Sequence, residues 1–225
     1  MSKHGYTSNI VLDLEFTPTR LGKGALGAEI IEVGAVEVDA RGNVVDEFSR
    51  MVKPLYSRGV SRITHRLTGI GNEDLTAARP LDAVLAEFAE WVGPGRVRMV
   101  TWSDADRLQL WKECAAKGIL AGLPVRWLDI QRLYPRLYGI PRQMVALERA
   151  CLNCGIPYEE RSAHRALYDA KVTAELFQMM RSGDMRFQRA RYEAELRRSQ
   201  ESTTLSSSIG DRCRGLAELY ALLPA

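Results

Sequence analysis

The first strongly apolar stretch of the chain is residues 9–15, Asn-Ile-Val-Leu-Asp-Leu-Glu, which ends in two acidic residues. A short and nearly continuous apolar run of this kind is typical of a strand that is covered on both faces of a sheet. Because successive side chains of a strand point to opposite faces, Asp13 and Glu15 are expected on the same face. The pattern predicts a central strand that presents two neighbouring carboxylates.

Two further strands are predicted after a loop rich in glycine. Residues 29–38 alternate and contain many β-branched side chains, and Arg41-Gly42-Asn43 forms a turn signal before a third strand near residues 44–52. These two strands alternate more clearly than the first. The three segments therefore predict an antiparallel meander with the first strand in the centre of the sheet.

Helical and strand patterns then follow each other along the chain. Residues 54–75 are irregular, whereas apolar residues recur at helical spacing between Leu81 and Val92. A strand at 97–102, a helix at 105–117 and a strand at 125–129 imply a right-handed parallel crossover. Three more helices are expected near residues 130–137, 144–154 and 165–181. The predicted fold class is α/β, with a mixed five-stranded sheet flanked by helices.

The C-terminal part of the chain differs in composition from the rest. Residues 185–198 are rich in Arg, Glu and Ala, residues 199–208 form a serine and threonine linker, and residues 213–223 have the pattern of a short amphipathic helix. Gly183 is a suitable end for the last core helix. We therefore expect a domain over residues 1–183 and a helical tail with a Ser/Thr linker over residues 184–225.

The composition is that of a globular protein. Of the 225 residues, 46% are apolar and 26% are charged, and no apolar stretch reaches the roughly 18–20 residues that span a bilayer. With no signal-like N-terminus and four scattered cysteines, we expect a cytoplasmic protein with reduced thiols and no membrane association. The spacing of Cys151 and Cys154 is that of half a zinc site, but no second pair follows, which favours a packing role.

Acidic residues supply the first candidate chemistry. Two carboxylates as close as those of Asp13 and Glu15 repel each other, unless a cation lies between them or one of them is protonated. A divalent metal explains the pair, although the tripeptide Asp-x-Glu is also common at solvated strand ends. Asp104 and Asp106 follow the strand at 97–102, where a helix begins. Either residue could be the helix N-cap. We choose Asp104 for the cap and Asp106 for the metal-binding role, with Asp104 as the alternative metal ligand.

A histidine and another aspartate complete the set. His164 precedes Asp169 by five residues, and five helical steps of about 100° separate two side chains widely around a helix. Both can reach one site only if His164 lies on the loop or cap before the helix. The alternative is a surface histidine and an exposed helical aspartate.

In this order, the motifs Asp13-x-Glu15, Trp102-Ser-x-x-Asp106 and His164-x4-Asp169 resemble those of the DEDDh 3′-to-5′ exonucleases of the ribonuclease H-like fold. The resemblance covers about residues 9–181 and is strongest to the Eri-type and sporulation-inhibitor-like exonuclease-domain proteins, which typically act on RNA. Ser103 replaces the usual glycine of that branch. The loop at 18–27 and the tail after Asp184 have no clear counterpart in it.

The resemblance implies a ribonuclease H-like fold and a two-metal site for Mg²⁺, with Mn²⁺ able to substitute. Asp13 would bridge both ions, Glu15 and Asp169 would bind one of them, and Asp106 would serve the other directly or through water. His164 would act as the general base, since histidine exchanges protons near neutral pH. The expected reaction releases nucleoside 5′-monophosphates from the 3′ end of a single-stranded nucleic acid, RNA more than DNA.

Six residues are candidates for contact with the substrate. The candidates are Phe16, Thr17, His65, Leu67, Thr68 and Trp102. Ordinary loop or core packing is the alternative for each of them. Phosphate contacts are expected from a set of cations that could equally be a solvated surface, namely Arg20, Lys23, Arg58, Arg62 and Arg66.

Three questions stay open at the level of the sequence. A proofreading-type DNA exonuclease has the same expected chemistry, because no residue is identified that reads the 2′-hydroxyl group. A regulatory binding protein that keeps the fold is an alternative of a different class. The chain is expected to be a monomer or a homodimer, and the C-terminal helix is a possible docking element for a protein partner.

Overall fold

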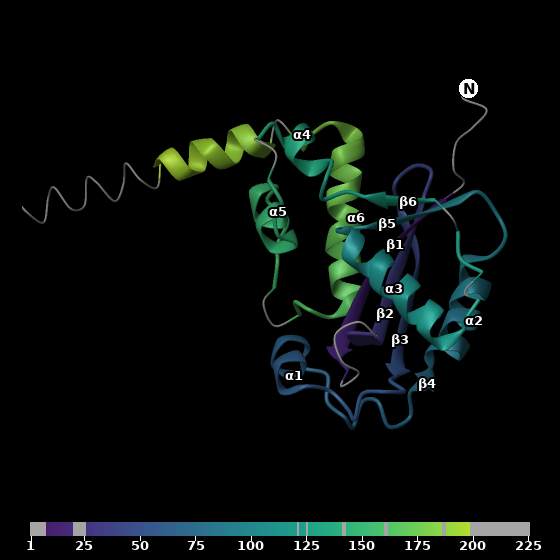
Figure 1. The fold of residues 1–225 in the computed structure, drawn as a ribbon. Coiled ribbons are helices and arrows are strands. Elements are labelled where there is room, and N and C mark those ends of the chain that lie inside the picture. Colours follow the sequence, from purple (N-terminus) through teal and green to yellow (C-terminus); the bar gives the residue numbers. More distant parts are fainter. Residues whose placement is uncertain are drawn as a thin grey trace, which may run out of the picture.

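The computed structural model describes residues 8–19, 26–120, 122–124, 126–140, 143–159, 162–185 and 188–198. Six strands in these ranges form one sheet in the order β4-β3-β2-β1-β5-β6. The strands are β1 (Ser8–Pro18), β2 (Ala28–Asp39), β3 (Val44–Lys53), β4 (Arg79–Pro80), β5 (Val97–Thr101) and β6 (Trp127–Asp129). The labelled helices are α1 (Arg62–Thr68), α2 (Leu81–Val92), α3 (Asp104–Lys117), α4 (Tyr134–Tyr138), α5 (Leu147–Asn153) and α6 (Ala166–Ser182), as Figure 1 shows. Residues 188–198 are helical as well.

The first strand lies inside the sheet, as predicted. It pairs antiparallel with β2 and parallel with β5, and β2 pairs antiparallel with β3. The predicted meander and the α/β class are confirmed. The sheet has one strand more than predicted, because the two residues of β4 pair with β3 at the edge. A strand this short leaves no alternating pattern in a sequence.

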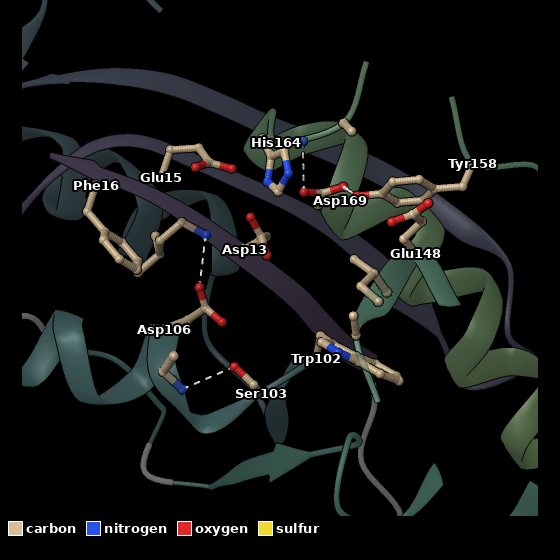
Figure 2. Close-up of a pocket in the computed structure, with 15 residues that line it drawn as sticks. Asp13, Glu15, Phe16, Trp102, Ser103, Asp106, Glu148, Tyr158, His164 and Asp169 are labelled. Atoms are coloured by element: carbon tan, nitrogen blue, oxygen red, sulfur yellow. Dashed lines mark hydrogen bonds between the residues drawn. The ribbon is translucent and has the colours of Figure 1, made fainter. Parts of the chain in front are cut away.

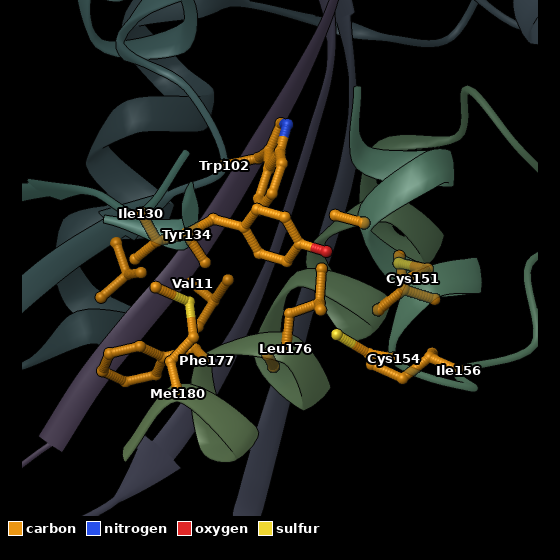
Figure 3. Close-up of a cluster of buried hydrophobic side chains, with 14 of the residues drawn as sticks. Val11, Trp102, Ile130, Tyr134, Cys151, Cys154, Ile156, Leu176, Phe177 and Met180 are labelled. Atoms are coloured by element: carbon orange, nitrogen blue, oxygen red, sulfur yellow. The ribbon is translucent and has the colours of Figure 1, made fainter. Parts of the chain in front are cut away.

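Helices cover both faces of the sheet, so β1 contributes to two hydrophobic clusters. Val11 packs in the cluster formed with α4, α5 and α6, part of which is shown in Figure 3. Ile10, Leu12 and Leu14 point to the opposite face and pack in the cluster formed with α2 and α3. This burial on two faces explains why the first strand is nearly continuously apolar.

One helix was missed by the sequence pattern. Helix α1 lies in the segment that was expected to be irregular, and Ile63 within it is 72% exposed. Its ends are well defined, because the Ser61 hydroxyl accepts a hydrogen bond from the Thr64 backbone N–H and Gly69 has a φ of 71°. The capping residues at its two ends, and not a periodic apolar face, are therefore the sequence signal of this helix.

The tail begins in contact with the domain. Gly183 ends α6 in a left-handed conformation, and Met185 is buried in the same cluster as Val11. The Arg189 guanidinium donates a hydrogen bond to the Gly139 carbonyl. The predicted linker, the last predicted helix, Arg20 and Lys23 lie outside the described residues. Among the helices that are described, none is both long and apolar enough to cross a membrane.

Candidate active site

The end of β1 places two carboxylates on the face that is covered by α6. In the antiparallel register, Asp13 lies opposite Gly34 and Glu15 lies opposite Glu32 of β2. The register shifts directly after Glu15, between Glu15 and Phe16. A shift of this kind redirects the following side chains, and Phe16 is 36% exposed.

Strand β2 positions the first turn of α6 beside these acids. A Cβ atom at Gly34 would lie 2.1 Å from the Leu167 backbone nitrogen, so only glycine lets the helix approach this closely. The buried carboxylate of Glu32 accepts hydrogen bonds from the Arg165 guanidinium and from the Ala166 backbone N–H. These contacts place Asp169, in the first turn of α6, near the end of β1.

The start of α3 brings in Asp106 and corrects the predicted cap. Ser103 is the N-cap, because its hydroxyl accepts a hydrogen bond from the Ala105 backbone N–H. Asp104 instead pairs with Arg107, at 2.6 Å between Oδ1 and Nε. Asp106 is buried, and its Oδ1 accepts a hydrogen bond from the Leu14 backbone N–H at 3.2 Å. The structure thus places Asp106 rather than Asp104 beside β1.

His164 precedes α6, where the spacing argument requires it. Its φ of 59° is left-handed, which is uncommon for a residue other than glycine. The His164 backbone N–H donates a hydrogen bond to Asp169 Oδ2 at 3.2 Å, while the imidazole is exposed. One possible ligand atom from each of Glu15, His164 and Asp169 can be chosen so that all three lie within 4.8 Å of one another.

All five predicted chemical residues line one open cavity of about 540 Å³. Figure 2 shows Asp13 in the middle of the group, with Asp106 on one side and His164 and Asp169 on the other. Cavities of this size are typical of sites for small molecules or single nucleotides.

The acidic side chains of the cavity lie close together and are largely shielded from water. Burial, followed by the charge of the Asp106 carboxylate, raises the pKa of Asp13 well above its ordinary value. Burial raises the pKa of Glu15 to about 8, with a further contribution from Asp169. Burial is also the largest cause that raises the pKa of Asp106 to about 7. Burial and mutual repulsion disfavour the ionised form of these carboxylates. A divalent cation bound between them would balance their negative charge. The donor set therefore fits a metal site.

The predicted substrate contacts divide into two groups. Phe16 and Trp102 line the cavity. Thr17 and Thr68 do not, and both hydroxyls are used inside the fold: the Thr17 hydroxyl accepts a hydrogen bond from the Ser61 backbone, and the Thr68 hydroxyl donates one to the Thr64 carbonyl.

The remaining candidates lie on and before α1. His65 and Leu67 are exposed on this helix and are not part of the cavity wall. The exposed side chains of Arg58, Arg62 and Arg66 lie on the same helix and the loop before it. Cys151 and Cys154 are buried as free thiols in the apolar core.

Among the residues of the cavity wall that were not predicted from the sequence, two have ionisable side chains. Tyr158 donates a hydrogen bond from its hydroxyl to Asp169 Oδ1 at 3.0 Å. Glu148 adds a fifth acidic side chain to the wall. Glu148 has the sequence signal of an ordinary acid in a first helical turn, and Tyr158 has no signal that separates it from other tyrosines.

Comparisons with known proteins agree with this geometry. Residues 10–117 match the family model RNase_T, described as an exonuclease. ERI1 exoribonuclease 2 of Danio rerio is 31% identical over 201 residues, which covers 79% of this chain and 36% of that protein. The PolC-type DNA polymerase III of Thermotoga maritima is 31% identical over 183 residues, covering 78% of this chain and 12% of the polymerase. The chain thus spans well under half the length of either relative.

A solved structure shows the same fold. The nuclease domain of 3′hExo, described as a DEDDh family member bound to rAMP, superposes with a TM-score of 0.70 at 23% identity. The similarity covers 80% of this chain and 94% of that domain. Together with the exonuclease family model and the carboxylate motifs in the cavity, this similarity confirms the resemblance seen in the sequence. The exonuclease family model and the exoribonuclease relative support the resemblance of this chain to the DEDDh exonuclease superfamily, and within it to the Eri-type branch.

Proposed function

We propose that this chain is a metal-dependent 3′-to-5′ exonuclease that hydrolyses single-stranded nucleic acid, RNA in preference to DNA, to nucleoside 5′-monophosphates. One observation carries the proposal: four carboxylates and a histidine, delivered by β1, α3 and the start of α6, line a single open cavity. Their separation along the sequence makes this meeting a property of the fold rather than of local composition.

The four acids Asp13, Glu15, Asp106 and Asp169 would hold the metal ions. Carboxylate oxygens are the ligands that Mg²⁺ prefers, so we propose Mg²⁺ with Mn²⁺ as a substitute. When bound, two divalent cations supply activation of a water molecule and stabilisation of the charge that develops on the leaving 3′ oxygen.

The other residues of the cavity act on the water and on the substrate. The imidazole of His164 would accept the proton of the attacking water, since it is exposed beside Glu15 and Asp169. Phe16, on the opposite side of β1 from His164 in Figure 2, offers an exposed ring on which the terminal base can stack.

Two similar proteins support the preference for RNA, and a third favours DNA. The Danio rerio relative is named an exoribonuclease, and the 3′hExo domain has bound rAMP. The PolC-type polymerase is equally identical in sequence, which favours a proofreading-type DNA exonuclease as the second candidate.

Digestion of matched 3′-labelled single strands of RNA and DNA tests the proposal. Each strand is incubated with Mg²⁺, Mn²⁺ or EDTA, and chromatography identifies the released products. Asp13→Asn is the inactive variant. Glu47→Gln is its matched control, because Glu47 pairs with Lys171 on the surface and does not line the cavity.

We expect metal-dependent release of nucleoside 5′-monophosphates by the wild type and Glu47→Gln, and none by Asp13→Asn. Faster release from DNA would overturn the RNA preference in favour of the second candidate. If neither strand loses label with either metal, the regulatory binding protein becomes the better explanation.

The domain organisation is part of the proposal. We assign residues 1–183 to the exonuclease domain and residues 184–225 to a helical tail with a Ser/Thr linker, whose last helix would dock a protein partner or a second copy. Since Met185 packs in the core, a deletion that tests the tail should begin after residue 198. Mass and activity of the shortened chain would show whether residues 199–225 matter for assembly.

A further inference from the structure

Asp169 is held by two hydrogen-bond donors that come from the same loop. The Tyr158 hydroxyl donates to Oδ1 at 3.0 Å, and the His164 backbone N–H donates to Oδ2 at 3.2 Å. Each carboxylate oxygen has further acceptor capacity after one such bond, so both can still bind a cation. The two donors fix the plane of the carboxylate between them.

The loop itself is fastened to α6 by a second tyrosine. The Tyr168 hydroxyl accepts a hydrogen bond from the Glu159 backbone N–H at 2.6 Å. The rings of Tyr158 and Tyr168 meet edge to face, with 5.7 Å between their centroids. The hydroxyl of Tyr158 in the loop thus donates a hydrogen bond to the helix, and the hydroxyl of Tyr168 in the helix accepts one from the loop. We call this reciprocal pair the tyrosine clasp.

The clasp continues toward His164. The backbone N–H groups of Ser162 and Ala163 both donate to the Glu159 carbonyl at 2.9 Å. The residue that Tyr168 anchors therefore also holds the turn immediately before the histidine. Figure 2 shows Tyr158 reaching Asp169 from the side opposite to Glu15.

We propose that Tyr158 is a positioning residue for the metal site: its hydroxyl orients the Asp169 carboxylate, and the contact with Tyr168 keeps it in place. This inference rests on the proposed function, because it takes Asp169 as a metal ligand. Residues that hydrogen-bond to metal ligands typically change metal affinity or activity by about 10–100-fold when they are removed.

Binding of Mn²⁺ to the full chain, measured by isothermal titration calorimetry without nucleic acid, tests the inference. Tyr158→Phe removes only the hydroxyl and keeps the ring. Tyr138→Phe is the matched control: its hydroxyl also makes one hydrogen bond, to the Asn153 carbonyl at 3.1 Å, but the residue does not line the cavity.

We expect Tyr158→Phe to raise the Mn²⁺ Kd by about 10-fold or more, and Tyr138→Phe to leave it unchanged. Tyr168→Phe should raise the Kd by a smaller factor, because it loosens the loop without touching Asp169. This second variant decides the question if Tyr158→Phe does not fold.

The possible failures are distinguishable. If the wild type and Tyr138→Phe bind Mn²⁺ and Tyr158→Phe binds it equally well, only the positioning role is refuted. If the wild type binds no Mn²⁺, the proposed metal site and this inference are refuted together. Equal losses in Tyr158→Phe and Tyr138→Phe would show a general effect of losing a hydrogen-bonded tyrosine hydroxyl, and would also overturn the inference.

Discussion

Arg165 and Glu32 form a two-point ion pair between the start of α6 and the middle of β2. Their contacts measure 2.8 Å between Nη2 and Oε1 and 3.1 Å between Nε and Oε2. Glu32 also accepts a hydrogen bond from the Ala166 backbone N–H at 3.0 Å. Because Arg165 lies next to His164, this pair fixes the helix start beside the histidine of the site.

Replacing Glu32 by alanine should lower the free energy of unfolding. The buried Ala166 N–H would lose its acceptor, which costs about 1–3 kcal/mol, and the Arg165 guanidinium would lose its partner. Urea unfolding measures the effect. Glu47→Ala is the matched control, because its ion pair with Lys171 is exposed and should contribute only about 0–1 kcal/mol. Equal losses in both variants would contradict the anchoring role of Glu32.

Gly34→Ala should displace α6 and weaken metal binding. The new Cβ would meet backbone atoms of Ala166 and Leu167, with the Leu167 nitrogen at 2.1 Å, and backbone cannot rotate away as a side chain can. Overpacking of this kind typically costs about 1–3 kcal/mol. Urea unfolding and Mn²⁺ titration report the two effects. In the control Gly27→Ala the new Cβ has no neighbour within 4 Å, so a similar loss there would refute the argument.

The sequence predicted features whose cause is local. The alternation of side chains in β1 placed Asp13 and Glu15 on one face, and the five-residue spacing placed His164 before its helix. The ion pair of Arg165 and Glu32 joins residues that are 133 positions apart, so no local pattern could predict it. Tyr158 was missed for a related reason. Its contact with Asp169 depends on the path of the loop before α6, which no sequence pattern predicts.

The cap of α3 shows a different limit. Ser103 and Asp104 are both good N-cap residues, so spacing alone did not separate them. In the structure Asp104 is the first residue of the helix, and its carboxylate pairs with Arg107, one turn further along. The short helix α1 was missed because its exposed apolar residues give no periodic face. Competition between two good capping residues explains the first difference, and the lack of a periodic apolar face explains the second.

The metal-free protein should lose stability through Glu15 as the pH rises. The folded state raises the pKa of Glu15 from 4.5 to about 8, so it keeps a proton that the unfolded chain releases. Its stabilising contribution is therefore fully present below about pH 4.5 and is lost as the pH rises toward 8. Tm measured in EDTA from pH 5 to pH 8.5 should fall less steeply for Glu15→Gln, which cannot ionise.

Addition of Mn²⁺ should reverse this loss. Because the cation competes with protons for the carboxylates, the increase in Tm on adding Mn²⁺ should be larger at pH 8 than at pH 5.5. The increase should be much smaller in Glu15→Gln. An equal increase at both pH values would mean that the acids of the cavity are not the metal ligands.

His164→Ala should reduce kcat by about 10²–10⁴-fold, the usual contribution of general base catalysis, while the Kd for Mn²⁺ stays unchanged. Alanine at the left-handed φ of 59° adds backbone strain, so His164→Gly serves as a matched variant that removes the imidazole without this strain. Single-turnover hydrolysis and Mn²⁺ calorimetry on both variants separate the two possible roles. The ligand atoms of Glu15, His164 and Asp169 are close enough for the histidine itself to bind a metal. A large rise of Kd in both variants would therefore assign His164 to the metal, and a normal kcat in both would remove it from the mechanism.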